Sequence, residues 1–301
     1  MAFRLPRFKR VPIVAAMRLT ERDREIIRLV HRHRFLRSFH IAALAGGSPQ
    51  QLSRRLKLLY HHGYLERPRA QLEYYGRPGS RRIVYGLGNK GVALLRREIG
   101  IAFHTGSWGE KNRSAGRMFL EHALLVSDVM VALELACRKS GRVRLIYEDQ
   151  LGLHAERQPF QWKVQMRGGL KLSVVPDRVF ALEFPDSNGL SQRVYFFLEA
   201  DRRTMPVVRR TLSQTSFRRK LLAYEATWTQ RLHRTRLGIH RFRVLTVTTS
   251  AARVKSLVYA CSRLKRGHGL FLFADRTILE KDVFSPVWQT GRPTKTVSLL
   301  D

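Results

Sequence analysis

Apolar residues recur at helical spacing through the first hundred positions of the chain. Leu52, Leu56 and Leu59 form one apolar stripe, and Thr20 stands where it can cap an earlier helix. Pro49 suits the first turn of the helix that carries this stripe, because a first-turn N–H has no helical partner to lose. In chain order we predict a helix after Thr20, helices over 39–46 and 49–62, strands over 64–70 and 81–87, and a helix over 90–100.

The rest of the chain alternates between helical and strand patterns. The segment 117–141 has the spacing of a long amphipathic helix, and 194–200 (VYFFLEA) has the composition of a buried strand. Further strands are expected over 142–151, 242–250 and 269–276, and further helices over 216–230 and 251–264. This order predicts a mixed sheet with helices on its faces, and thus an α+β or α/β fold class.

A polar stretch rich in Gly and Ser, 101–116, separates these two patterns and is interpreted as a linker. The chain then divides into a basic N-terminal arm over 1–17, a small domain over 18–100, the linker, and an α/β domain over 117–301. A length of 301 residues is enough for two domains of ordinary size, each with its own core.

The balance of charge indicates the kind of partner. Lys and Arg number 56 against 23 Asp and Glu, which gives a formal net charge of +33. A surplus of that size repels itself unless it meets a polyanion, so nucleic acid is the expected partner. An anionic membrane is the rival, but the sequence has neither an amphipathic basic helix beside an apolar anchor nor an apolar run of membrane-spanning length. We therefore expect no membrane partner.

Cysteine usage narrows the class of protein further. Cys137 and Cys261 lie far apart, and neither has a second Cys or a His at ligand spacing. A structural zinc and a disulfide framework are therefore not expected. Two isolated thiols suit a reducing compartment, and we predict a cytoplasmic protein.

The order of elements over 18–100 resembles a winged helix-turn-helix: helix, short helix, turn, helix and a two-stranded wing. A recognition helix must show polar and basic residues to the major groove while its other face holds the core. The helix over 49–62 has this division. Its DNA-contacting candidates are Gln50, Gln51, Ser53, Arg54, Arg55 and Lys57, and those of the wing are Arg77, Arg81 and Arg82.

Glutamine and arginine can make bidentate contacts with base edges, and wing arginines can reach phosphates or the minor groove. Double-stranded DNA is thus the predicted partner. Two other interpretations stay open: a solvated basic face on an ordinary helix, and a winged helix that binds protein.

Acidic residues stand at predicted strand ends in the second half. Asp177 precedes an apolar stretch, Glu199 ends the buried strand, and Asp201 follows two residues later. Such a group of carboxylates could hold Mg²⁺ or Mn²⁺, which prefer oxygen ligands. The alternative is that these acids pair with some of the many cations.

The spacing of these acids resembles the PD-(D/E)xK nuclease superfamily. The resemblance implies a nuclease-like fold, with metal ligands and catalytic roles at Asp177 and Glu199; Asp201 is a candidate metal ligand from its position beside Glu199. Asp201 stands where that superfamily has a lysine, and Lys220 on the next helix could supply the amine instead.

Taken together, both halves resemble the replication-relaxation family of plasmids and mobile elements. The resemblance spans about 18–275 and rests on Glu121-His122, Pro176-Asp177, Leu198 to Arg202, Lys220 and Tyr224. It implies a DNA-binding protein that acts in plasmid replication, relaxation or mobilisation, with plasmid replication or mobilisation proteins, or a second copy of itself, as partners. A divalent-metal-dependent nicking nuclease and a winged-helix transcription regulator are the alternatives.

Overall fold

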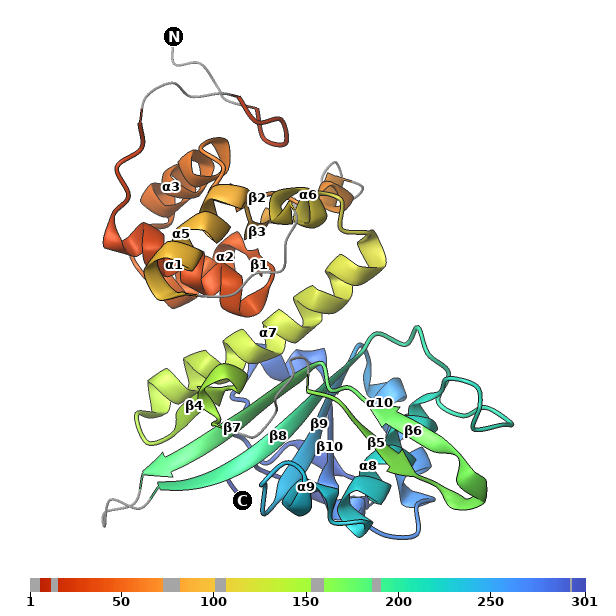
Figure 1. Ribbon diagram of the computed structural model, residues 1–301. Helices are drawn as coiled ribbons and strands as arrows, with labels where there is room; N and C mark the ends of the chain where they lie inside the picture. Colours follow the sequence, from red (N-terminus) through yellow and green to blue (C-terminus); the bar gives the residue numbers. More distant parts are fainter. Residues whose placement is uncertain are drawn as a thin grey trace. The chain divides into compact units, whose positions relative to one another are not determined.

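The computed structural model describes residues 6–11, 16–72, 82–100, 107–152, 160–185, 191–292 and 294–301 (Figure 1). The chain forms two compact units, Met1–Val131 and Ala132–Asp301, and the boundary falls within one long helix, α7 (Arg117–Ser140). Throughout the described ranges, every helix is too short or too polar to cross a membrane.

The N-terminal unit is mainly helical. Its elements are α1 (Glu21–His33), β1 (Leu36–Arg37), α2 (Ser38–Ala45), α3 (Pro49–His61), β2 (Leu65–Glu66), η1 (Arg69–Gln71), β3 (Val84–Leu87), α5 (Asn89–Ile99), α6 (Trp108–Arg113) and the first half of α7. The three short strands form an antiparallel sheet in the order β1-β3-β2, with Leu36 opposite Tyr85 and Leu65 opposite Leu87.

Local sequence accounts for the first helices of this unit. The Thr20 hydroxyl accepts from the Asp23 N–H, and the Asp23 carboxylate accepts from the Thr20 N–H at 2.7 Å, so the predicted cap of α1 is confirmed. Leu52, Leu56 and Leu59 of α3 are each no more than 2% exposed. Burial of this stripe fixes which face of α3 remains in contact with solvent.

The predicted linker 101–116 contains α6, which the sequence analysis missed. The Asn112 side chain on this helix is 1% exposed and donates a hydrogen bond to the Leu87 carbonyl oxygen at 2.8 Å. α6 therefore packs on β3 of the N-terminal unit. Its sequence, WGEKNR, has no apolar periodicity from which a helix could be predicted. Polar contacts, such as that of Asn112, hold it in place. The predicted domain boundaries stay predictions.

The C-terminal unit is built on a mixed sheet in the order β12-β11-β10-β9-β8-β7-β4, in which β8, β9 and β10 are parallel neighbours. A separate hairpin pairs β5 with β6. The strands are β4 (Arg144–Tyr147), β5 (Trp162–Gln165), β6 (Lys171–Val174), β7 (Arg178–Pro185), β8 (Ser191–Asp201), β9 (Phe242–Thr248), β10 (Phe271–Asp275), β11 (Trp288–Thr290) and β12 (Thr296–Val297). The helices are α8 (Phe217–Thr229), α9 (Leu232–Thr235) and α10 (Ala251–Ser262), with short 3₁₀ turns η2 (Glu148–Gln150), η3 (Arg167–Gly169), η4 (His268–Leu270) and η5 (Arg276–Glu280).

One apolar core joins the sheet to its helices. It contains Phe197 of β8, Tyr224 of α8, Leu257 of α10 and Phe271 of β10, each no more than 1% exposed. The β5–β6 hairpin lies beside α8 and adds Trp162 to the same core (Figure 1). A helical N-terminal unit followed by a mixed-sheet unit confirms the predicted fold class.

An ion pair ties α3 to the start of α1. The Asp23 side chain is fully buried, and its two oxygens accept from the Arg55 Nε at 2.7 Å and from an Arg55 terminal nitrogen at 2.6 Å. Burial acts to raise the pKa of the Asp23 carboxyl, but hydrogen bonds from Arg55 and Thr20 outweigh it and hold that pKa below 3.8. This pair therefore stabilises the fold at neutral pH.

We expect Arg55→Ala to lower the free energy of unfolding by about 2–3 kcal/mol at pH 7, because it leaves a buried carboxylate without its cation. The native pKa of Asp23 lies below its unfolded value, so the stabilisation is complete above pH 3.8 and is lost as the pH falls through the native pKa. Urea unfolding from pH 7 to pH 2, with the neighbouring Arg54→Ala as control, checks both statements. An equal loss in the two variants at pH 7, or a loss that does not shrink in acid, would contradict them.

Candidate functional site

One face of α3 shows polar side chains to solvent. Pro49 occupies the first helical position, and the apolar stripe of the helix is buried. The exposed predicted residues are Gln50, Gln51, Ser53 and Arg54, and Lys57 is half-buried on the same helix. The structure thus leaves four of the six predicted α3 residues exposed, and Arg55 is half-buried like Lys57.

Arg55 differs from the other five predicted residues. Besides its two contacts with Asp23, its terminal nitrogen donates to the Arg18 carbonyl oxygen at 2.6 Å. Most donors of this guanidinium are therefore bound within the unit. The geometry gives Arg55 a structural role and leaves Arg54 as the exposed arginine of the pair.

The predicted wing is described in part. Arg77 and Arg81 lie outside the described residues. Arg82 is exposed, and its guanidinium carbon lies 5.0 Å from the centre of the Phe39 ring, a cation–π contact. This contact places a cation beside α2, just before the wing strand β3.

Part of the predicted basic arm is held against the N-terminal unit. The Arg10 guanidinium donates to the Tyr60 carbonyl oxygen at 2.9 Å and to Glu66 at 3.0 Å. The Val11 N–H donates to Nδ1 of His61 at 3.2 Å. These contacts position a segment of the arm at the end of α3.

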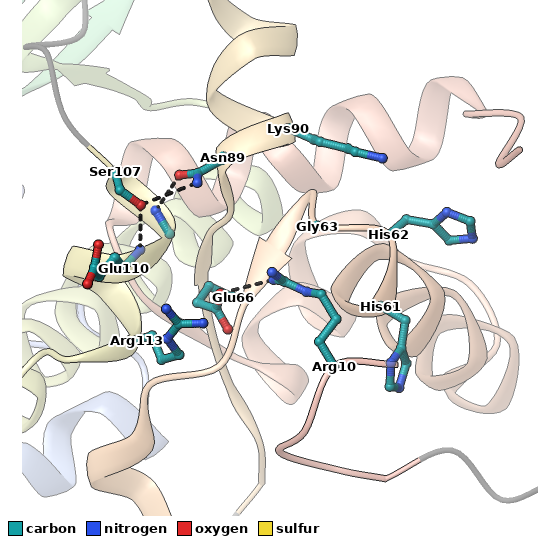
Figure 2. A pocket seen from close by; sticks show the side chains of 11 residues that line it. Arg10, His61, His62, Gly63, Glu66, Asn89, Lys90, Ser107, Glu110 and Arg113 are labelled. Atoms are coloured by element: carbon teal, nitrogen blue, oxygen red, sulfur yellow. Dashed lines mark hydrogen bonds and ion pairs between the residues drawn. The ribbon is translucent and has the colours of Figure 1, made fainter. Parts of the chain in front are cut away.

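A polar pocket of about 520 Å³ opens beside this arm, between the end of α3, the start of α5 and α6 (Figure 2). Arg10, Lys90 and Arg113 line it together with the acids Glu66 and Glu110. Cations and carboxylates are mixed here, and Figure 2 shows the Arg10–Glu66 ion pair within the pocket. The charges that line the pocket therefore favour neither an anionic nor a cationic ligand.

The C-terminal unit brings three predicted residues together. Glu199 lies near the carboxyl end of β8, is 2% exposed, and accepts from Lys220 and, at 2.6 Å, from the Tyr224 hydroxyl. The Asp177 carboxylate accepts from the Ala200 N–H at 2.7 Å, which places it next to the same strand end. Asp177, Glu199, Lys220 and Tyr224 are called the acid cluster below.

Burial and charge set the ionisation of the acid cluster. Burial raises the pKa of the Glu199 carboxyl, and the Lys220 ammonium opposes that rise. Burial acts to lower the pKa of Lys220, but Glu199 and Asp177 outweigh it and raise that pKa above 10.5. Burial also raises the pKa of Tyr224 well above 10, so its hydroxyl stays protonated and donates to Glu199.

Asp201 has other partners. Its two oxygens accept from Arg253 at 2.7 and 3.0 Å, and the Thr248 hydroxyl adds a bond of 2.8 Å. Arg253, itself 8% exposed, also donates to the Met205 carbonyl oxygen at 2.7 Å. Asp201 therefore holds Arg253 in position, and Arg253 anchors the loop that follows β8 through Met205. Sequence reasoning missed Arg253, because nothing in a segment of helical pattern indicates a partner 52 positions away.

Two of the predicted metal ligands, Glu199 and Asp201, are bound by protein donors in this structure. Both oxygens of Glu199 and both of Asp201 accept from protein donors. Among the described residues, no group of three or more His, Cys, Asp or Glu side chains is placed to hold a metal ion. Mg²⁺ and Mn²⁺ take several oxygen ligands that face one point, whereas Glu199 faces a lysine and a tyrosine, and Asp201 faces an arginine.

Comparison with protein families adds a finding that spans both units. A family model described as replication-relaxation matches residues 27–241. The chain belongs to the replication-relaxation family. This confirms the resemblance drawn from the sequence, and the description of the family indicates a role in replication. Searches of curated proteins and of solved structures give no match.

In this replication-relaxation protein we expect the acid cluster to contribute to stability. Glu199→Gln should lower the free energy of unfolding by about 3 kcal/mol, because it leaves the Lys220 ammonium without its main partner. Tyr224→Phe removes one hydrogen bond and should cost about 1 kcal/mol. Thermal and urea unfolding give both values, and Glu280→Gln makes the same chemical change at an exposed carboxylate. A Glu199→Gln loss no larger than that of Glu280→Gln would contradict this role.

Proposed function

We propose that this protein binds double-stranded DNA through α3 during replication of a plasmid or other mobile element. The single observation that carries the proposal is the division of α3, whose leucine stripe is buried while Gln50, Gln51 and Arg54 are exposed. A helix with this division can lie in a major groove without disturbing the core that holds it.

The elements around α3 support a winged helix-turn-helix. α1, α2 and α3 are followed by β2 and β3, which pair antiparallel, and β1 completes a three-stranded sheet. In such a unit the second helix of the turn enters the groove and the strands reach the neighbouring backbone. Arg82, exposed just before β3, is placed on the strand side of this unit.

Electrostatics supports a polyanionic partner. The net charge of +33 produces a field that attracts a phosphate backbone and favours rapid encounter. Each phosphate that a lysine or arginine neutralises releases condensed counterions, so binding should weaken steeply with salt. Glutamine and arginine on α3 would then add preference for particular base edges.

Family membership favours replication over simple transcription control. A transcription regulator would use the same face of α3, so both functions share the DNA contact and differ in what the C-terminal unit does. Replication or mobilisation proteins, and a second copy of this chain, stay predicted partners of that unit.

A nicking nuclease is the second candidate, and one observation favours it: Asp177, Glu199 and Lys220 lie together near a strand end. The hydrogen bonds of the acid cluster act against it, since the carboxylate oxygens already have protein donors. We propose that the acid cluster stabilises the C-terminal unit and does not cleave DNA.

Arg54→Ala should weaken binding of duplex DNA about fivefold to tenfold and reduce the log–log salt slope by about 1, because one phosphate or base contact is lost. Fluorescence anisotropy with a labelled duplex at several salt concentrations measures both quantities. Arg97→Ala is the matched control, since it removes the same charge from an exposed position on α5. Equal weakening in the two variants would contradict a specific role for α3.

Supercoiled plasmid incubated with the protein and either Mg²⁺ or Mn²⁺ should stay supercoiled, because both oxygens of Glu199 already accept hydrogen bonds from Lys220 and Tyr224. Agarose gel electrophoresis reports nicking directly. Nicking by the wild-type protein that Glu199→Ala abolishes, while Glu280→Ala retains it, would overturn this assignment and establish the nuclease.

A further inference from the structure

A second pocket, of about 660 Å³, lies in the C-terminal unit where β8 and β9 begin. The end of α8, the helix α9 with the segment after it, and the last residues of the chain complete its wall. Arg193 at its rim precedes Glu199 by six positions on β8, which is about 20 Å along a strand. The pocket is therefore separate from the acid cluster. Its volume suits a small organic ligand.

An exposed indole lines this pocket. Trp228, in the last turn of α8, is 41% exposed, whereas Trp162 and Trp288 of the same unit are 2% and 1% exposed. A large aromatic side chain that remains open to a pocket offers a flat apolar face at low entropic cost. Nucleic-acid bases stack on such faces with little dependence on their identity.

Cations surround the indole. Arg234 and Arg241 are exposed and line the pocket, and Arg243 lies deeper, where its guanidinium donates to the Asp301 carbonyl oxygen at 2.9 Å. Burial lowers the pKa of the Arg243 guanidinium, and the charge of Asp301 opposes that change. Arg193 is already held by Glu183 at 2.8 Å. Of the described residues, four arginines and one acid, Asp301, line the pocket, so the local charge favours an anionic ligand.

We propose that this pocket binds a nucleotide unit, with its base stacked on Trp228 and its phosphate held by Arg234 and Arg241. The unit can be a free mononucleotide or part of a single-stranded nucleic acid, since both offer a base and a phosphate. This site belongs to the C-terminal unit and does not depend on duplex binding by α3. An acidic peptide would use the arginines but gain nothing from the indole.

Calorimetric titration of the full chain tests the pocket with four probes: thymidine 5′-monophosphate, a short oligothymidylate, inorganic phosphate and hexaglutamate. We expect the mononucleotide, the oligothymidylate or both to bind, and more tightly than phosphate or hexaglutamate. Arg234→Ala with Arg241→Ala should weaken this binding at least tenfold. Trp228→Ala should weaken it about tenfold, and Trp228→Phe should retain most of it.

The control is Arg263→Ala with Lys265→Ala, which removes the same charge from exposed positions outside the pocket. Binding by the mononucleotide assigns the site to free nucleotides, and binding by the oligothymidylate alone assigns it to a strand. Failure of both to bind, equal weakening by the control pair, or equal affinity for phosphate or hexaglutamate would overturn the proposal. Circular dichroism of each variant separates loss of binding from loss of folding.

Discussion

The fold depends on the pairing of a small number of buried acids with a large excess of cations. The chain has 23 acidic residues against 56 lysines and arginines, and a charge can be buried at tolerable cost only when a partner is present. Among the described residues, buried acids that pair with a cation from another element or segment are Asp23 with Arg55, Glu66 with Arg10, Glu183 with Arg144 and Arg193, Glu199 with Lys220, and Asp201 with Arg253. All of these pairs except Glu183 with Arg193 join residues more than 20 positions apart.

This use of acids explains how one composition supports both a stable interior and a cationic surface. Cations that meet a buried carboxylate, such as Arg55 and Arg253, hold helices and loops in place. Cations without such a partner stay at the surface, where they are available to phosphates. The proposed DNA contact on α3 and the proposed nucleotide pocket both use this second group, one in each unit. Membership of the replication-relaxation family agrees with the proposal that these surfaces bind nucleic acid.

The sequence predicted most elements and the division of α3, because apolar periodicity and caps are local properties. It also brought Asp177 and Glu199 together, because residues at the ends of neighbouring strands meet at one edge of a sheet, and it offered Lys220 from the next helix. It could not distinguish Arg54 from Arg55, since both lie off the leucine stripe and only the position of Asp23 on α1 separates their roles. The periodicity of apolar residues does not indicate which distant residues pair in the folded protein.

The same limit explains the other differences. Asp201 was predicted as a metal ligand from its position after a strand, but Arg253 of α10 reaches it across the parallel β8–β9 pair. Helix α6 and the strands β11 and β12 were not predicted, because polar contacts hold α6 in place and the two strands are only three and two residues long. The pocket around Trp228 draws on segments that lie far apart along the chain.

The most direct test of the account is arginine-specific footprinting of the full chain with phenylglyoxal, read by mass spectrometry with and without duplex DNA. Arg54 should react readily in the free protein and become protected when DNA is bound. Arg55 should react slowly in both states, because Asp23 and the Arg18 carbonyl hold it. Equal reactivity of the two arginines, or an Arg54 whose reactivity DNA does not change, would contradict the account.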